Sequence, residues 1–506
     1  MGIPSYFNYI LRNHTNIISK KRQVSSDYLF VDANSLIYDT INNYKECIPD
    51  DFESIYLDVY NNITKLISTV SPKKKSYICF DGVPPVAKIM QQKQRRFKST
   101  LTSEILSTGS TSSFNRNQIT PGTLFMKGLD RYLIEAFESY DDIVFSGSSI
   151  PMEGEQKICK IISSHQSLKD KNLIIYGLDA DLFMLGLLMV FKGNNIFLFK
   201  ETKYFRYIKG INDGELYYFN INTFSSQLTK ELQVNEKQSI CDYCLLAFLC
   251  GNDFLPHLHC VNIRNEGISY IIEKYLELNK FQNKPLINII NGKINWKHFR
   301  HFITLLVKDE KDKILENLSW KISQKKKIRP LSEADKLDLL PCVDNEKEMY
   351  VYNNIEEFNN LIFPNINPKD VSKNYIEMIE WTWYYYFNNG VLDNTKFYNY
   401  ANAPLLSDCL KFIPLFNDDC VVRDKTTVEI SNTTLLLYVL PFQEHRRVLS
   451  CDEYKRVSAV VYNQIPLIKE TNYKIDYFLC KFFWEGHLNI ANIDIFHLNN
   501  IIVENI

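Results

Sequence analysis

Seven acidic residues follow short apolar segments or stand two positions apart. This acidic cluster consists of Asp32, Asp81, Glu153, Glu155, Asp179, Asp181 and Asp253. In extended backbone, residues two apart point to the same side, so Glu153 with Glu155, and Asp179 with Asp181, can each reach one shared ion. A single acid after a strand is most simply a solvated turn residue. The repeated placement favours one common site instead.

Such a cluster predicts a metal centre. Seven carboxylates gathered at one place repel one another unless cations neutralise them. Ligation by oxygen alone suits Mg²⁺ or Mn²⁺ and does not suit Zn²⁺. Two such ions about 3.5 to 4 Å apart can activate a water molecule and stabilise the leaving oxygen of a phosphodiester. The indicated chemistry is phosphodiester hydrolysis without a protein nucleophile.

A cationic helix face begins soon after Asp81. Pro84 and Pro85 precede a helical segment in which four residues share one side. We call them the basic face: Lys88, Gln92, Arg95 and Arg96. Arg and Lys side chains suit a terminal phosphate better than a base edge. A 5′ phosphate held this close to the metals predicts removal of mononucleotides from an RNA or DNA end, and the alternative is a merely solvated face.

Short apolar runs separated by helical stretches indicate buried parallel strands. The runs are Leu29 to Val31, Tyr77 to Phe80, Ile143 to Phe145 and Leu173 to Tyr176. The alternation predicts an α/β fold with a parallel or mixed sheet flanked by helices, in which ligands collect beyond the carboxyl ends of the strands. Before the first run, Pro4 can start a helix that packs against the body. Its inward residues would be Ile3, Phe7, Ile10 and Leu11.

Past residue 230 the pattern becomes helical and aromatic. We therefore expect two domains: a nuclease domain over residues 1–230 and a helical domain over 231–506, which supplies the last acidic motif near 251–257. A basic run before Pro330 indicates an exposed connection. That run is Lys325, Lys326, Lys327 and Arg329.

Composition limits the class of protein. A chain of 506 residues with 45% hydrophobic content is long enough for two packed domains. No apolar run approaches the roughly 18 to 20 residues that cross a bilayer, and the twelve cysteines show no disulfide framework. We expect a soluble, cytoplasmic protein. The formal net charge of −1 does not exclude nucleic acid, because opposite charges can segregate locally.

Two further signals have simpler interpretations. Cys241 and Cys244 form a CxxC motif near other cysteines and histidines, which permits a zinc site, but small buried thiols on a helix explain them more simply. The neighbouring residues are Cys250, His257, His259 and Cys260. A run of aromatic residues from Trp381 to Phe387 can stack on bases, although such a stripe is more often part of a core.

Several motifs occur in the order found in the Xrn family of 5′ to 3′ exoribonucleases, which is related to the flap endonucleases. The chain resembles that family at Met1 to Pro4 with Phe7, Asp81 to Phe97, Ile119 to Thr123, Glu153 to Glu155, Tyr176 to Asp181 and Gly251 to His257. Resemblance continues at Ala403 to Asp408, Val439 to Pro441 and Trp484 to Gly486. It therefore covers essentially the whole chain.

The resemblance implies a flap-endonuclease or PIN-like core in which the acidic cluster holds two divalent ions and the basic face binds a 5′ phosphate. It implies hydrolysis of single-stranded RNA with a 5′ monophosphate to nucleoside 5′-monophosphates in mRNA decay. A decapping enzyme that acts upstream is the implied partner. The N-terminal segment would block a duplex. Longer members carry extra domains, so we expect a catalytic core alone. Short members occur in large DNA viruses, and the compact length agrees with such an origin.

Three positions depart from the family pattern. Tyr38 stands where the family has a stacking His and keeps a flat ring for a base. The family's Trp-rich stacking segment is replaced near Asn394 and Lys396, where Phe397 or Tyr398 can substitute. Met152 replaces a small residue before Glu153.

Two other functions stay open. A structure-specific DNA flap nuclease shares the carboxylate chemistry, and a catalytically silent RNA-binding protein shares the fold. Retention of all seven acids argues against a silent protein, while a comparison of RNA and DNA substrates separates the two nucleases.

Overall fold

The structure is a computed structural model of a single chain. It describes residues 3, 5–44, 51–106, 114–177, 179–201, 216–280, 283–325, 350–351, 353–388, 393–417, 427–471, 473–476, 478, 480 and 485–505. Pro4 and the basic run from Lys326 to Pro330 lie outside the described residues, so the expectations attached to them stay predictions.

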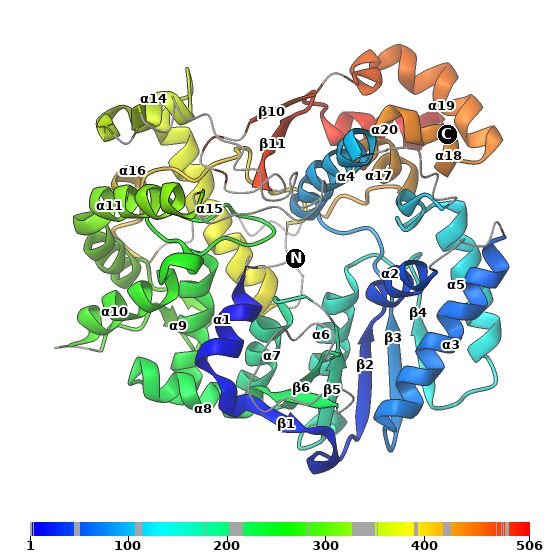
Figure 1. The fold of residues 1–506 in the computed structure, drawn as a ribbon, viewed down its shortest axis with the longest axis horizontal. Helices are drawn as coiled ribbons and strands as arrows, with labels where there is room; N and C mark the ends of the chain where they lie inside the picture. The colour runs from blue at the N-terminus through cyan, green and yellow to red at the C-terminus, as the bar shows by residue number, and fades with distance from the viewer. Residues whose placement is uncertain are drawn as a thin grey trace.

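A seven-stranded mixed sheet forms the centre of the N-terminal half (Figure 1). The strand order is β1-β7-β6-β5-β2-β3-β4. Neighbours from β6 to β4 are parallel, whereas β7 is antiparallel to both β6 and β1. The strands are β1 (Ile18–Lys20), β2 (Tyr28–Asp32), β3 (Lys75–Cys79), β4 (Ile143–Ser146), β5 (Asn172–Tyr176), β6 (Asn195–Phe199) and β7 (Tyr217–Asn220).

The α/β fold and the four expected strands are confirmed as β2, β3, β4 and β5. These strands could be recognised as apolar runs, of which β2 and β5 are buried on both faces and β4, at the sheet edge, is only partly buried. Strand β6, with the sequence Asn-Ile-Phe-Leu-Phe, is equally apolar and was not among the expected strands.

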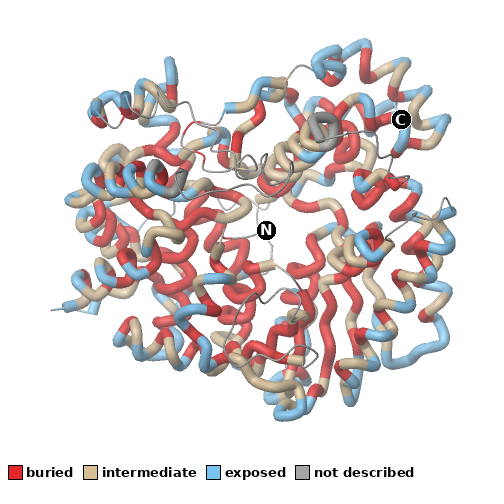
Figure 2. The backbone as a smooth tube through the Cα atoms, viewed as in Figure 1, coloured by how far each residue is buried: buried red, intermediate tan, exposed pale blue. Residues whose placement is uncertain are grey.

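Alternate residues of each strand face two separate layers of core. Phe30 and Ile175 point into one layer, whereas Leu29 and Ile174 point into the other. The first layer is covered by α6 (Gly154–Ser164), α7 (Leu182–Phe191), α8 (Ile221–Leu232) and α9 (Glu236–Phe248). The second is covered by α2 (Asn34–Asn43), α3 (Phe52–Val70) and α5 (Leu124–Phe137). Figure 2 shows the strands as a continuous buried region between these helices.

The expected N-terminal helix is α1 (Tyr6–Asn13), and it packs against the body. Ile3, Ile10 and Leu11 are buried as expected. The fourth inward residue is Tyr6, which is fully buried, whereas Phe7 is only partly buried against Phe183 and Phe219. All four expected residues therefore contact the core, Phe7 less deeply than the others, and Tyr6 was not among them.

Residues beyond the sheet are mainly helical, as expected. The helices are α10 (Gly267–Asn279), α11 (Trp296–Lys325), α14 (Phe358–Ile362), α15 (Pro368–Phe387), α16 (Leu406–Phe412), α17 (Asn432–Val439), α18 (Phe442–Val448), α19 (Cys451–Gln464) and α20 (Ile495–Asn505). Two small hairpins pair β8 (Ile287–Asn288) with β9 (Lys293–Ile294), and β10 (Lys474–Asp476) with β11 (His487–Asn489). Short 3₁₀ turns connect elements at η1 (Thr15–Ile17), η2 (Lys21–Gln23), η3 (Arg116–Gln118), η4 (Gln166–Leu168), η6 (Ile263–Asn265), η7 (Ile355–Glu357) and η8 (Pro466–Lys469).

Helix α4 (Val86–Leu106) joins the two halves of the chain. Its residues Val86 and Ile89 share a core with α17, α18, α19 and α20, and Figure 1 shows α4 beside α17 and α20. A larger core runs from Ile3 to Phe478 without a break at residue 230. The boundary between 1–230 and 231–506 stays a prediction. Within the described residues, no helix is both long and apolar enough to span a membrane.

Candidate active site

The acidic cluster gathers beyond the carboxyl ends of three adjacent strands. Asp32 ends β2, Asp81 follows β3, and Asp179 follows β5. Because these strands are parallel neighbours in the order β5-β2-β3, their carboxyl ends meet at one edge. Asp253 reaches the same place from the loop after α9.

The two acid pairs reach the cluster from helix starts, so the expectation of extended backbone holds at Glu153, with φ of −70° and ψ of 150°, and is wrong at Glu155 and Asp181. Glu153 precedes α6 and Glu155 lies in its first turn, while Asp181 has helical backbone angles just before α7. Both members of each pair still interact electrostatically with the cluster. Carboxylates are favoured at these positions because the N-terminus of a helix carries partial positive charge.

Asp81 is fixed by groups from two other elements. Asn34 Nδ2 donates to Asp81 Oδ2 at 2.6 Å, and the Gly154 amide donates to Asp81 Oδ1 at 2.7 Å. A side chain at Gly154 would place its Cβ 2.7 Å from Asp32 Oδ1. The glycine therefore lets the α6 backbone approach both acids.

Lys88 connects the basic face to the acidic cluster. Its Nζ lies 2.6 Å from Glu153 Oε1 and 2.5 Å from Asp253 Oδ2. The three side chains are nearly buried, with exposed fractions of 9%, 6% and 4% in that order. Although burial opposes ionisation, the Lys88 ammonium holds the pKa of Asp253 below its usual range. The first residue of the basic face is thus an ion-pair partner of the acids.

Four other acids of the cluster, Asp32, Asp81, Glu155 and Asp181, have a raised pKa because they are buried beside other carboxylates. Burial, together with the Asp81 carboxylate, raises the pKa of Asp32 well above its usual range. Burial and the nearby Asp253 raise the pKa of Asp181 to about 6. Mutual repulsion of this kind is what a bound cation would relieve. In the described residues, no three acidic, histidine or cysteine groups already stand in a geometry that could hold a metal ion.

The remaining residues of the basic face share one side of α4. Arg96 donates to the carbonyl oxygens of Arg116 at 3.2 Å and Ile119 at 2.7 Å. Its buried Nε has no hydrogen-bond partner among the described residues. Arg95 lies close enough to act on the charge of Asp253, and Gln92 is partly exposed. A buried donor beside these cations is suited to an anionic ligand.

Tyr38 of α2 lies within interaction range of the Arg96 guanidinium and is partly exposed. It therefore borders the basic face. Of the two other stacking candidates, Tyr398 is buried and donates to the Asn402 carbonyl at 2.7 Å. Phe397 is partly exposed and packs beside the core that contains Val86. Phe397 is thus the more accessible ring.

The aromatic run contains functional contacts that sequence reasoning missed. Its residues are buried, apart from the partly buried Phe387, as expected for a core. However, Tyr385 donates its hydroxyl to Glu153 Oε2 at 2.7 Å, and Tyr386 donates to Asp181 Oδ2 at 2.8 Å. The sequence signal was the excess of tyrosine over phenylalanine, since a buried hydroxyl needs a partner.

Met152 has a left-handed backbone with φ of +96° directly before Glu153. Its backbone is held by an exchange of hydrogen bonds, in which Met152 donates to the Val83 carbonyl at 3.0 Å and Gly82 donates to the Met152 carbonyl at 2.8 Å. This conformation strains a residue with a side chain. The loop therefore holds Glu153 at a fixed place despite the departure at Met152.

The cysteines of the CxxC motif agree with the expected buried thiols. Cys241, Cys244, Cys250 and Cys260 are buried free thiols, and burial raises the pKa of Cys250 to about 12. His259 is engaged with the Ala403 carbonyl oxygen at 2.9 Å.

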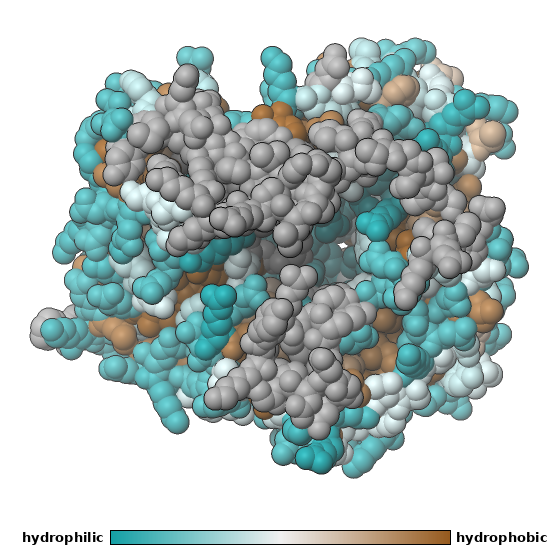
Figure 3. Space-filling view, viewed as in Figure 1, coloured by the Kyte–Doolittle hydropathy of each residue, from teal (hydrophilic) through white to brown (hydrophobic). Residues whose placement is uncertain are grey.

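Figure 3 shows a hollow near the middle of one face, between α4 and α6, in which the visible side chains are mostly hydrophilic.

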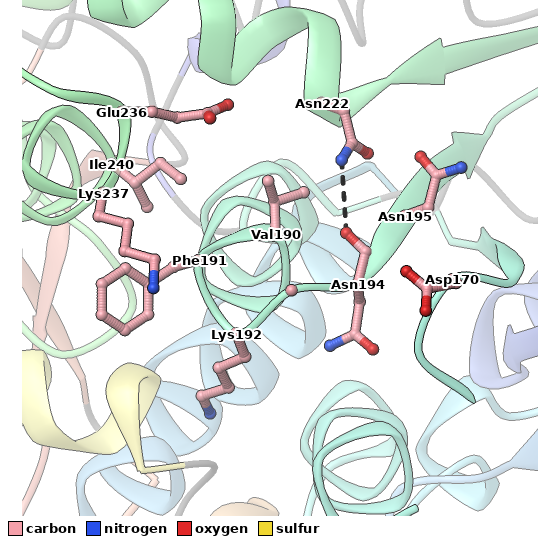
Figure 4. A pocket seen from close by; sticks show the side chains of 11 residues that line it. Asp170, Val190, Phe191, Lys192, Asn194, Asn195, Asn222, Glu236, Lys237 and Ile240 are labelled. Atoms are coloured by element: carbon pink, nitrogen blue, oxygen red, sulfur yellow. Dashed lines mark hydrogen bonds between the residues drawn. The ribbon is translucent and has the colours of Figure 1, made fainter. Parts of the chain in front are cut away.

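A separate cavity of about 540 Å³ lies at the opposite edge of the sheet, where β6, α8 and α9 begin (Figure 4). Asn194, Asn222, Glu236 and Lys237 are among its lining residues. None of its lining residues belongs to the acidic cluster or the basic face.

Comparison with protein families places these features in a known group. A model described as the XRN 5′-3′ exonuclease N-terminus matches residues 1–202. A second, described as the Xrn1 helical domain, matches residues 233–357, so the two together span well over half of the chain. The chain belongs to the Xrn family. The acidic cluster and the basic face of this Xrn-family chain lie within the matched segments.

Curated relatives of the Xrn-family chain are longer proteins. The 5′-3′ exoribonuclease 1 of Saccharomyces cerevisiae is 30% identical over 379 residues, which cover 64% of this chain and 24% of the relative. The human 5′-3′ exoribonuclease 1 is 25% identical over 501 residues, or 81% of this chain and 29% of the relative. The Xrn-family chain therefore spans about a quarter of the length of these relatives. A solved structure of the catalytic core of Rad2 with DNA covers 72% of this chain and 87% of its own, with 14% identity and a TM-score of 0.33.

Proposed function

We propose that this Xrn-family chain is a 5′ to 3′ exoribonuclease that hydrolyses single-stranded RNA with a 5′ monophosphate to nucleoside 5′-monophosphates. The observation that carries the proposal is the direct contact between the basic face and the acidic cluster through Lys88. A phosphate-binding surface and a hydrolytic centre in contact favour cleavage close to a terminal phosphate. The names of the curated relatives support the same reaction and substrate class.

The proposed cofactors are two Mg²⁺ or Mn²⁺ ions, held by the acidic cluster. The donor set fits these ions because it consists of carboxylate oxygens that repel one another as they stand. Divalent ions bound there supply an activated water and a stabilised leaving oxygen. Glu153 and Asp253 would then be held by both Lys88 and the cations, and the Lys88 ammonium would lie close to the substrate phosphate.

The proposed end selection rests on the basic face. Arg95, Arg96 and Gln92 offer donors to the oxygens of a 5′ monophosphate, and the buried Arg96 Nε has no acceptor within the part of the chain that the structure describes. A hydroxyl end leaves these donors unpaired, while a cap or triphosphate adds bulk. Tyr38 and Phe397 are the rings proposed to stack on bases.

The test compares kcat/KM on RNAs that differ only in a hydroxyl, monophosphate, triphosphate or capped 5′ end. We expect the monophosphorylated RNA to be degraded fastest, with release of mononucleotides, and expect no reaction in EDTA. We expect Asp181→Asn to abolish hydrolysis, because the loss of one carboxylate misplaces a metal ion.

Arg95→Ala should weaken the preference for monophosphate over hydroxyl by about 1 to 3 kcal/mol. Equal rates on all four ends, or digestion from the 3′ end, would refute the proposal. Faster cleavage of a DNA flap than of monophosphorylated RNA would favour the flap-nuclease alternative.

The proposed substrate also defines the reaction that supplies it. An RNA with a 5′ monophosphate arises when a cap is removed, so a decapping enzyme is the proposed upstream partner in mRNA decay. Cytoplasmic action fits the reduced thiols, since every cysteine in the described part of the chain is free.

A further inference from the structure

Helix α15 reaches the acidic cluster from the helical half of the chain. Its Tyr385 hydroxyl donates to Glu153 Oε2 at 2.7 Å, and its Tyr386 hydroxyl donates to Asp181 Oδ2 at 2.8 Å. Both tyrosines are buried, with exposed fractions of 2% and 1%. Neither is exposed enough to act as a surface for RNA bases.

The two adjacent tyrosines serve different acids because successive helical residues point about 100° apart. Helix α15 packs against α7 and α9 (Figure 1), so one hydroxyl reaches the acid before α6 and the other reaches the acid before α7. The opposite oxygen of each acid is also engaged. Glu153 Oε1 contacts Lys88, and Asp181 Oδ1 accepts from the Ile3 amide at 3.2 Å.

The same helix also supports the loop that carries Asp253. Phe254, the next residue, has its ring centre 5.0 Å from that of Tyr385 and 5.1 Å from that of Trp381. Trp381 and Tyr385 are stacked at 5.0 Å. Aromatic packing of this kind fixes the backbone beside the acid. Helix α15 thus contacts three acids of the cluster, directly or through their neighbours in the chain.

We propose that Tyr385 and Tyr386 are positioning residues that fix Glu153 and Asp181 in the orientation that binds divalent cations. The inference rests on the proposed function and deepens it, because it assigns helix α15 a part in cation binding. A hydroxyl fixes one oxygen of its carboxylate and leaves the remaining lone pairs for a cation. Partners of this kind around a metal site typically change metal affinity 10- to 100-fold when removed.

The test is Mn²⁺ binding by calorimetry to Tyr385→Phe, Tyr386→Phe and the double variant, alongside RNA hydrolysis titrated with Mg²⁺. Phenylalanine keeps the ring packing and removes only the hydroxyl. We expect each single variant to raise the Kd for Mn²⁺ about 10-fold or more. We also expect the Mg²⁺ concentration at half-maximal activity to rise, with hydrolysis largely restored at saturating Mg²⁺.

The matched control is Tyr275→Phe. Tyr275 of α10 is also buried and donates to a carboxylate, Asp242 Oδ2, at 2.6 Å, but Asp242 is no part of the acidic cluster. This variant should lose a similar amount of stability with unchanged Mn²⁺ affinity. Circular dichroism and Tm compare the folding of all variants.

The outcomes separate this inference from the proposed function. Unchanged Mn²⁺ affinity in both single variants, or an equal loss in Tyr275→Phe, overturns the positioning role even if the unmutated chain hydrolyses RNA. A weakened Mn²⁺ affinity in a chain that hydrolyses no RNA supports the positioning role and overturns the exoribonuclease proposal. An unmutated chain that binds no Mn²⁺ overturns both.

Discussion

Gly154 occupies a position where a side chain would collide with the acidic cluster. The Cβ of an alanine would lie 2.7 Å from Asp32 Oδ1 and 2.9 Å from the Cys79 carbonyl oxygen. We expect Gly154→Ala to lower kcat about 100-fold, because misplacing a catalytic group by about 1 Å has an effect of that size. Single-turnover hydrolysis with saturating Mg²⁺ measures this change.

Gly193→Ala is the control for Gly154→Ala. Gly193 has φ of +92°, and its added Cβ would meet nothing within 4 Å. The Gly193→Ala variant should therefore lose about 1 kcal/mol of stability through backbone strain and keep its kcat. A Gly154→Ala chain with normal kcat would show that the α6 backbone need not approach Asp32 so closely.

Tyr38 gives a second prediction for a single residue. Loss of the ring in Tyr38→Ala should weaken RNA binding by about 1 to 3 kcal/mol, whereas Tyr38→His keeps a ring for stacking and should be tolerated. Tyr38→Phe separates the ring from the hydroxyl that lies near Arg96. KM for monophosphorylated RNA measures the effect. An equal KM in the unmutated chain, the alanine variant and the histidine variant would remove Tyr38 from the site.

Among the elements, α4 is held in place from behind by the C-terminal hairpin. Gln94 accepts a hydrogen bond from the Leu488 amide at 3.0 Å and donates to the Leu488 carbonyl at 2.9 Å. Gln94→Leu leaves both backbone groups unpaired, so we expect the unfolding free energy to fall by about 1 to 3 kcal/mol. Because α4 carries the basic face, KM for monophosphorylated RNA should rise more than kcat falls.

Asn463→Ala is a suitable control, since it removes an exposed amide that donates to the Ala459 carbonyl on α19, away from the basic face. It should leave KM unchanged. If Gln94→Leu lowers the unfolding free energy and still binds monophosphorylated RNA normally, the hairpin does not position the basic face.

The sequence predicted the strands and the acids that follow them because both depend on local pattern. Buried strands read as apolar runs, and parallel strands bring Asp32, Asp81 and Asp179 to one edge by topology alone. The hydroxyls of Tyr385 and Tyr386 could not be placed this way. They meet acids 232 and 205 residues away in the chain, and such contacts follow from helix packing that no local period encodes. Residue spacing placed Lys88 on the basic face but could not show that it pairs with two acids of the cluster.

For the whole molecule, the crowded acids link stability to pH and to cations. The pKa of Asp181 is raised to about 6, and those of Asp32 and Glu155 are raised further above their usual range, with burial as the main cause. A folded-state carboxyl with a raised pKa binds its proton more tightly than in the unfolded chain. The unfolding free energy of the metal-free protein should therefore fall as pH rises from about 4 through about 6.

A divalent cation replaces those protons, so we expect Mg²⁺ to raise Tm more at pH 8 than at pH 5. Thermal unfolding with and without Mg²⁺ at each pH measures the difference. Asp242, whose pKa burial also raises to about 6, adds a pH dependence that Mg²⁺ leaves unchanged. An equal Mg²⁺ effect at both pH values would contradict a cation site in the acidic cluster.

The contact of α15 with Glu153 and Asp181 also bears on how the protein is made. Synthesis runs from the N-terminus, so all seven acids emerge from the ribosome before Tyr385 and Tyr386, and the β11 segment that holds α4 emerges later still. We expect a nascent chain arrested at residue 366 to hydrolyse no RNA in Mg²⁺, whereas the released chain does, as a ribosome-arrest assay would measure. The contacts that complete the site therefore form only after the whole acidic cluster has been synthesised.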